Sequence, residues 1–208
     1  MIKAVLLIFE PVATWDRIAL ARRSIILILA MNLLPLLVVA SVGEGYGLIH
    51  WGRERGSVSH TQTFSRPEAA IFEAGQFLIS LVIVFVGAKM LKSVGETFHG
   101  RTTYTQAFTA IAYGLGPLFL LRLLDAIPKV NPWVSWSIGI VLSIAALYHG
   151  VPRLMEPDPS HALGLYFMCA LLVILLTGML RYVTWYYLSG QFPALEALIS
   201  QLAARMHH

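Results

Sequence analysis

Long apolar stretches alternate with short polar segments along the chain, and each stretch is close to the length of a membrane-crossing helix. An α-helix rises about 1.5 Å per residue, so about 20 apolar residues span the hydrocarbon core of a bilayer. Five stretches reach this length, although Arg122 interrupts the third of them near its end. The pattern predicts five transmembrane helices, at residues 24–42, 69–88, 105–124, 132–151 and 162–180.

The segment before the first predicted span has a different pattern. Apolar residues recur at helical spacing on either side of Pro11, and they include Trp15. Arg17 and Arg23 would be costly to bury in a bilayer, which argues against an extension of the first span. We therefore predict an interfacial amphipathic segment over residues 1–23, with Trp15 at the depth of the lipid headgroups.

Composition places the chain among membrane proteins. Of its 208 residues, 57% are hydrophobic and 12% are charged, whereas a soluble domain has about 25% charged residues. No internal repeat or low-complexity linker divides the sequence. We predict an all-α integral membrane protein with one domain over residues 1–208, in which five transmembrane helices follow an N-terminal interfacial amphipathic helix.

The distribution of charge predicts the orientation. The formal net charge is +4, but the Lys and Arg residues flank the apolar stretches, so a nucleic-acid partner is not indicated. With five spans, one side of the membrane holds eight Lys and Arg residues and the other holds seven. The four that precede the first span carry most weight and predict a cytoplasmic N-terminus and an external C-terminus. The Gly- and Ser-rich loop at residues 43–67 is then external.

Helix breakers interrupt the third predicted span in its middle, in the sequence "AIAYGLGPLFLL". Proline removes a backbone donor, so in a membrane neighbouring helices or polar side chains must satisfy the freed backbone groups. We expect the Tyr113 hydroxyl to bond a carbonyl freed by Pro117. Small residues here also allow another helix to approach closely. We interpret the break as a packing kink or as a groove for a lipid or partner, formed by Tyr113, Gly114, Gly116 and Pro117.

Two polar pairs bracket the same span. Thr103 and Gln106 have the spacing of a capping box, which predicts that a helix begins just after Gly100. Arg122 and Asp125 are three residues apart and predict an ion pair at the end of the helix. An exposed pair of this kind contributes only about 0.3 kcal/mol.

Carboxylates and histidines on the predicted cytoplasmic side are the strongest candidates for metal chemistry. Glu96 and His99 are three residues apart, a spacing that places two metal ligands on one helix face, and His149, Asp158 and His161 lie on the same side. Di-metal helix bundles supply two Glu-x-x-His pairs, whereas this chain has one. A polar loop without a metal is therefore the competing interpretation, and we assign no cofactor.

Other functional motifs are absent from the sequence. It contains no Gly-x-Ser-x-Gly, no His-Glu-x-x-His and no Walker loop, which disfavours an enzyme. Many transporters show internal duplication with broken helices in matching positions. Pro35 and Pro117 break two predicted spans, but the sequences around them share too little to form a repeat.

Four motifs follow one another along the chain: "FEPVATWDRI", "FHGRTTYTQAFTAIAYGLGP", "AIPKVNPWVSWSIGIVL" and "LYHGVPRLMEPDPSHAL". In this order they resemble the Yip family of Rab- and Ypt-interacting membrane proteins, and in particular its compact prokaryotic branch. The resemblance runs from Phe9 to Tyr182. It implies a five-helix fold with a cytoplasmic N-terminus and an external C-terminus, in agreement with the distribution of charge.

The resemblance also implies a function. Eukaryotic members bind one another and lipidated Rab GTPases, and they shape or traffic membranes. This chain shows no long acidic or Pro-rich cytosolic tail and no Asp-Leu-Tyr-Gly-Pro element ahead of the first span, which disfavours a Rab-type GTPase as a partner. We expect a non-enzymatic interaction or membrane-organising module of a prokaryotic inner membrane, whose partners are membrane lipids, itself or another membrane protein. The alternatives are a small-molecule or ion transporter and a metal-dependent membrane enzyme that uses the Glu, His and Asp residues.

Overall fold

The computed structural model describes residues 2–55, 60–98, 102–189, 191–192, 197–199 and 201–202, with the backbone alone for 53–55 and 60–62. Apolar stretches and helix caps divide the chain into mostly helical elements. In chain order these are α1 (Ile2–Phe9), α2 (Pro11–Ala21), α3 (Ile25–Ile28), the π-helical η1 (Leu29–Leu33), α4 (Leu34–His50), β1 (Arg53–Arg55), β2 (His60–Gln62), α5 (Arg66–Thr97), α6 (Tyr104–Gly114), α7 (Gly116–Leu121), the 3-10 helix η2 (Arg122–Ala126), α8 (Pro132–Met155) and α9 (Ala162–Leu188).

The described residues form five helices that are long and apolar enough to cross a membrane, which confirms the predicted fold class. We call them the first to fifth spans: Ile25–His50, Arg66–Thr97, Tyr104–Ala126, Pro132–Met155 and Ala162–Leu188. Each helix is longer than the stretch predicted from the sequence, because polar and charged residues continue it at one or both ends.

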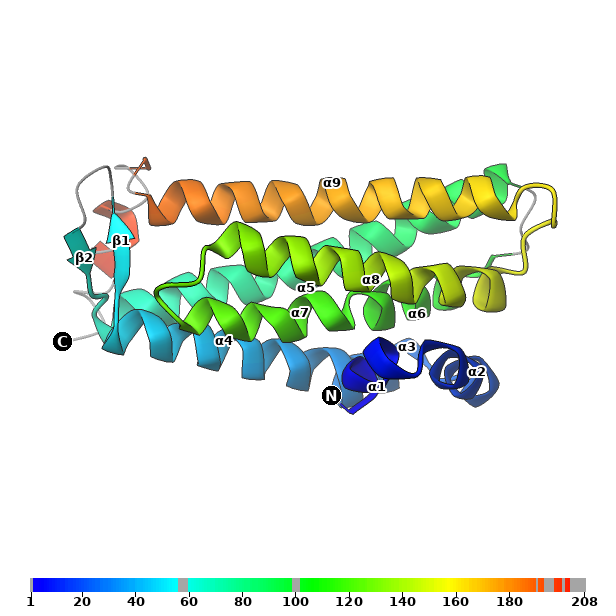
Figure 1. The fold of residues 1–208 in the computed structure, drawn as a ribbon, viewed down its shortest axis with the longest axis horizontal. Coiled ribbons are helices and arrows are strands. Elements are labelled where there is room, and N and C mark those ends of the chain that lie inside the picture. Colours follow the sequence, from blue (N-terminus) through cyan, green and yellow to red (C-terminus); the bar gives the residue numbers. More distant parts are fainter. Residues whose placement is uncertain are drawn as a thin grey trace.

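The spans run side by side along the long axis of the molecule (Figure 1). In that view α9 and α4 lie on opposite sides, with α7 and α8 between them and α5 behind. The third span is the central one: 78% of its apolar window is buried, against at most 44% in the other spans. The stretch with the least regular sequence pattern is therefore the one around which the others pack.

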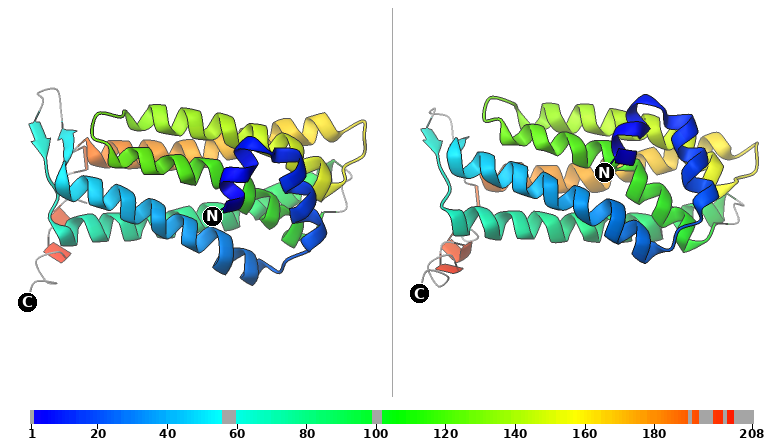
Figure 2. Two further views of the ribbon diagram at one scale, coloured as in Figure 1. Left: turned by 60° about the horizontal axis from the view of Figure 1, so that its bottom comes forward. Right: turned by 90° about the horizontal axis from the view of Figure 1, so that it is seen from below.

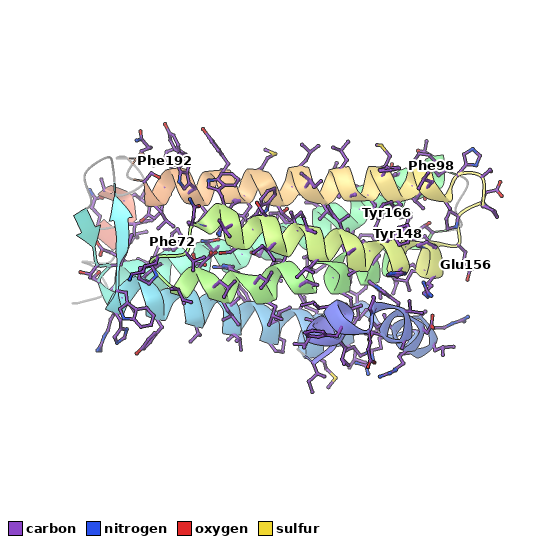
Figure 3. All side chains as sticks on the ribbon, viewed as in Figure 1. Phe72, Phe98, Tyr148, Glu156, Tyr166 and Phe192 are labelled. Atoms are coloured by element: carbon purple, nitrogen blue, oxygen red, sulfur yellow. The ribbon has the colours of Figure 1, made fainter. Side chains whose placement is uncertain are left out.

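The predicted external loop at residues 43–67 is shorter than expected. The first span continues as helix to His50, and β1 and β2 then form a two-stranded antiparallel hairpin. Ser65 and Glu68 form a capping box that starts α5. The hairpin lies at the end of the bundle opposite α2 (Figure 1), and Figure 3 shows Phe72 and Phe192 toward this end and Glu156 at the other.

Helices α1 and α2 pack on α7 and α8 at the side of the bundle (Figure 2). Trp15 is 0% exposed, and its indole N–H donates to the carbonyl of Ala146 at 2.7 Å. The Trp15 ring therefore packs inside the protein and is not surrounded by lipid headgroups, while its depth in the membrane stays a prediction. The physical reason is Gly150: a Cβ there would lie 2.4 Å from the Trp15 ring, so only a glycine leaves space for the indole against α8.

The break in the third span is closed by a neighbouring helix. Helix α6 ends at Gly114 and α7 begins at Gly116, and the backbone N–H of Leu118 in the first turn of α7 donates to the hydroxyl of Ser143 on α8 at 3.1 Å. The bond that the sequence suggested from the Tyr113 hydroxyl to a freed carbonyl is not found among the described residues; the hydrogen bond at the break instead uses Ser143 as an acceptor, which no local pattern indicates. The capping box of Thr103 and Gln106 at the start of α6 is confirmed.

We predict that Gly150→Ala destabilises the protein by about 1–3 kcal/mol, because the added methyl group overpacks the contact between α8 and the Trp15 ring. Thermal unfolding in detergent measures the effect. Gly75→Ala is the matched control, since a Cβ at Gly75 meets nothing within 4 Å and alanine favours helix. Equal unfolding temperatures for the two variants would contradict the tight docking of α2.

Candidate functional site

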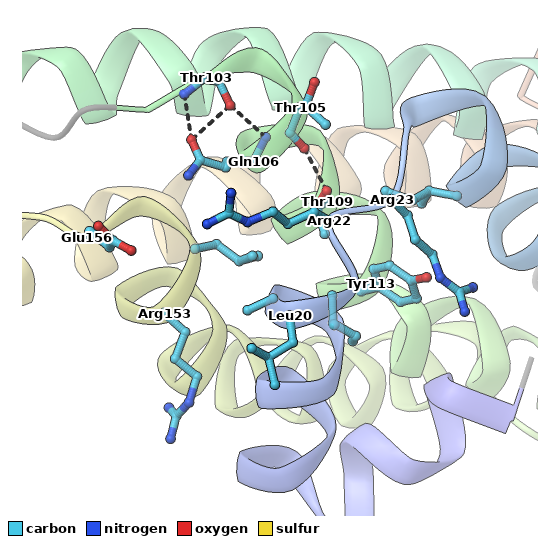
Figure 4. Close-up of a pocket in the computed structure, with 14 residues that line it drawn as sticks. Leu20, Arg22, Arg23, Thr103, Thr105, Gln106, Thr109, Tyr113, Arg153 and Glu156 are labelled. Carbon is cyan, nitrogen blue, oxygen red and sulfur yellow. Dashed lines mark hydrogen bonds between the residues drawn. The ribbon is translucent and has the colours of Figure 1, made fainter.

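A cavity of about 580 Å³ opens where the connection between α2 and α3 crosses the start of α6 and the end of α8. Its volume falls within the range of about 300–1,000 Å³ that is usual for small-molecule sites. Figure 4 shows polar side chains from α6 and the α2–α3 connection around it. We call it the arginine pocket; its lining includes Arg22, Arg23, Arg153, Glu156, Thr103, Thr105, Gln106, Thr109 and Tyr113, with an apolar wall of Ile18, Ala19, Leu20, Ile28 and Leu154.

The three arginines of the pocket differ in their partners. Arg153 donates to Asp16 Oδ1 at 2.7 Å and to the carbonyl of His149 at 2.8 Å, so its charge is compensated. Within the described part of the chain, neither Arg22 nor Arg23 has a carboxylate within 4.0 Å. In Figure 4 Arg22 reaches toward Gln106 and Thr109, and Arg23 projects beside Tyr113.

The start of α6 adds hydrogen-bonding groups to the pocket. The capping box uses the side chains of Thr103 and Gln106 for each other's backbone N–H groups. The Thr109 hydroxyl donates to the Thr105 carbonyl at 2.6 Å. The first turn of a helix carries a partial positive charge, so this wall of the pocket favours anions.

Two residues of the pocket have an unusual backbone conformation. Arg22 has φ = 39° at the end of α2, and Glu156 has φ = 41° at the end of α8. They are the only non-glycine residues with positive φ in the ranges that the structure describes, and both line this cavity. A left-handed L-residue costs about 1–2 kcal/mol, and such outliers tend to gather at functional sites.

Lys3 adds positive charge beside the pocket. Its ammonium lies 5.3 Å from the centre of the Tyr113 ring, which is a cation–π distance. Burial lowers the pKa of Lys3 below the usual 10.5, and the charges of Arg23 and then Arg17 lower it further. The largest part of this lowering of the pKa reflects burial, and the rest reflects a positive potential from Arg23 and Arg17.

The predicted groove of the third span divides into two parts. Tyr113 lines the arginine pocket. Gly114, Gly116 and Pro117 are buried. A Cβ at Gly114 would lie 2.4 Å from Leu147, and one at Gly116 would lie 3.0 Å from Ala4. The glycines therefore admit α8 and α1 to close contact.

The structure does not bring together those metal candidates that it describes. Within its described ranges, no three His, Cys, Asp or Glu side chains are placed to hold a metal ion. Glu96 pairs with Lys92 at 3.2 Å on the surface of α5, and the His161 ring contacts Ser160 Oγ at 3.0 Å. His99 lies outside the described residues. His149 and Asp158 belong to no metal-binding group there.

The exposed helix-end pair of Arg122 and Asp125 is also corrected. Both residues are buried, and each binds a partner from another span. Arg122 Nε donates to Glu44 Oε2 at 2.7 Å, and its Nη2 donates to Glu73 Oε2 at 2.5 Å. The sequence missed Glu44 as a partner because the predicted first span ends before it, whereas the helix carries Glu44 into the bundle.

A second arginine completes this buried ionic network. Arg181 Nη2 donates to Asp125 Oδ2 at 2.6 Å, and Arg181 Nε donates to the Pro132 carbonyl at 2.9 Å. Arg122, Asp125 and Arg181 also line a small cavity of about 50 Å³. The sequence did contain a signal for this network, namely charged residues inside apolar helices. Few such residues are tolerated in a membrane without a partner.

We predict that Arg122→Met destabilises the protein by about 3–5 kcal/mol, because it leaves Glu44 and Glu73 buried without their counter-charge. Thermal unfolding in detergent gives the difference. The control is Arg17→Met, which removes an exposed pair with Glu10 at 3.8 Å and costs about 1 kcal/mol or less. Similar losses for both variants would contradict a structural role for the buried network.

We predict that Arg23→Gln raises the pKa of Lys3, because it removes one of the positive charges that lower it. The folded state holds fewer protons than the unfolded chain between the lowered pKa and 10.5, so stability rises with pH through that window in the wild type. NMR titration of ¹³C-methylated lysine measures the pKa directly. An unchanged Lys3 pKa in both Arg23→Gln and Arg17→Gln would refute the positive potential.

Comparison with known proteins gives one match. The Yip1 domain family model matches residues 5–181, which include both N-terminal helices for most of their length and the spans up to Arg181. No curated protein and no solved structure shows a significant match. Because the matched range covers most of the chain, this multi-pass membrane protein belongs to the Yip1 domain family.

Proposed function

We propose that the protein is a non-enzymatic interaction or membrane-organising module that binds a lipid or a membrane protein at the arginine pocket. The observation that carries this proposal is the pocket itself, part of whose lining comes from α2, which packs on α8. Membership of the Yip1 domain family supports it.

The chemistry of the pocket lining favours binding over catalysis. Among its described lining residues Glu156 is the one carboxylate, and none is a histidine, cysteine or lysine. Activated nucleophiles need an adjacent base or a lowered pKa. Cys169, the single cysteine of the chain, is buried in the fifth span, away from this lining.

The pocket would face the cytoplasm. Lys3, Arg17, Arg22 and Arg23 precede the first span, and Lys and Arg concentrate on the cytoplasmic side of membrane proteins. We propose a cytoplasmic N-terminus, an external C-terminus and a prokaryotic inner membrane as the location.

Transport is a second candidate, favoured by the buried ionic network. Charged residues inside membrane helices often mark an ion pathway. A cation or proton flux through the wild-type protein in proteoliposomes would support this alternative. The metal-dependent enzyme gains no support from the described residues.

Photo-crosslinking in native membranes tests the proposed module. A benzophenone amino acid replaces Leu20, which lines the pocket and is 83% exposed, or Met179, which is exposed on α9 away from it. We expect the Leu20 probe to capture one lipid class or one protein, and the Met179 probe to capture lipids in proportion to the membrane composition. The same set of adducts at both positions would overturn the proposal.

A further inference from the structure

Two cations of the arginine pocket lack a carboxylate counter-charge. Arg22 and Arg23 form no ion pair within the part of the chain that the structure describes, while Arg153 nearby is held by Asp16. Arg22 is exposed and Arg23 is half-buried, so both guanidinium groups are accessible to an anion that enters the pocket. Guanidinium groups bind phosphate through two parallel hydrogen bonds, which makes phosphate the anion that this pair suits best.

A buried hydroxyl faces the same space. Tyr113 is 1% exposed and lines the pocket, and its hydroxyl makes no hydrogen bond of normal geometry with any residue that the structure describes. Arg23 is the charged group beside it. The Thr105 side chain and the first turn of α6, with its partial positive charge, complete this wall. Such a wall suits a ligand with several acceptor oxygens.

The shape of the pocket requires more than a free phosphate. The cavity of about 580 Å³ has an apolar wall that includes Ile18, Leu20 and Ile28. Leu20 continues this wall to the surface, where it is largely exposed. A ligand that fills both regions has an anionic head and an apolar tail. Basic pockets between membrane helices are suited to phospholipid headgroups.

The backbone of the pocket is held in a costly conformation. The left-handed residues Arg22 and Glu156 both line the cavity, and neither is the glycine that usually ends a helix in this way. At Arg22 the guanidinium side chain, rather than the backbone, is then what the site needs.

We propose that the arginine pocket binds an anionic phospholipid, with its phosphate in the space that Arg22, Arg23 and Tyr113 line and an acyl chain along the apolar wall. This inference rests on the proposed function, because it names the ligand of the same pocket. Glu156 limits the site to one favourable anion position by repelling negative charge on the α8 side.

Native mass spectrometry of the whole protein in detergent tests the inference with phosphatidylglycerol and phosphatidylcholine at equal concentration. The wild type is expected to retain one phosphatidylglycerol, with a preference over phosphatidylcholine of about tenfold or more. One charge-assisted hydrogen bond to the lipid is enough to raise the affinity by about this factor. Arg22→Gly should remove about this factor while leaving the unfolding temperature equal or higher, because glycine relieves the left-handed backbone.

Glu156→Gly is the matched variant. It relieves the same backbone conformation but removes a negative charge, so phosphatidylglycerol retention should stay equal or increase. Equal losses in Arg22→Gly and Glu156→Gly would overturn the inference, as would an absence of lipid preference in the wild type. Displacement of the lipid by inorganic phosphate would also overturn it, since the site would then recognise the free anion.

Failure of this inference is separable from failure of the proposed function. If no lipid preference is found but the Leu20 probe still captures a single protein, the lipid assignment is wrong and the interaction module stands. If the Leu20 probe captures only bulk lipid as well, both proposals fail.

Discussion

Two buried arginines tie together all five spans of this membrane protein. Arg122 of the third span holds Glu44 of the first and Glu73 of the second, and Arg181 of the fifth holds Asp125 of the third and the Pro132 carbonyl that begins the fourth. Removing such charges from water is costly, and the cost is offset only when their partners face them. The network therefore fixes how each helix is rotated about its axis. Apolar side chains alone would not fix this rotation, because they are equally favourable against lipid and against another helix.

The pocket at the other end depends on this arrangement through the third span. The network anchors the hairpin end of that span, while Gly114 and Gly116 in its middle admit Leu147 of α8 and Ala4 of α1. With α1 seated there, α2 follows along α8 and Trp15 docks against Gly150. The α2–α3 connection is then held over the start of α6, and this placement brings Arg22 and Arg23 to the cavity.

The sequence predicts what depends on local patterns. Five apolar stretches indicate five spans, and the capping box of Thr103 and Gln106 marks where α6 begins. Contacts between distant residues escape such reasoning. Glu44 was placed in a loop because charge near the end of an apolar run suggests an interface, yet the helix continues and Arg122 stabilises the carboxylate inside the bundle. Trp15 was placed in the headgroups because nothing local to it reveals the space left by Gly150.

A double-mutant cycle between Arg122 and Glu44 tests the central claim most directly. The free energy of unfolding is measured in detergent for the wild type, Arg122→Met, Glu44→Gln and the double variant. If the buried pair fixes the packing of the spans, the two substitutions are coupled by about 1–3 kcal/mol, and the double variant is more stable than the sum of the single losses predicts. Additivity within about 0.5 kcal/mol would show that the pair is incidental and would contradict this account of the fold.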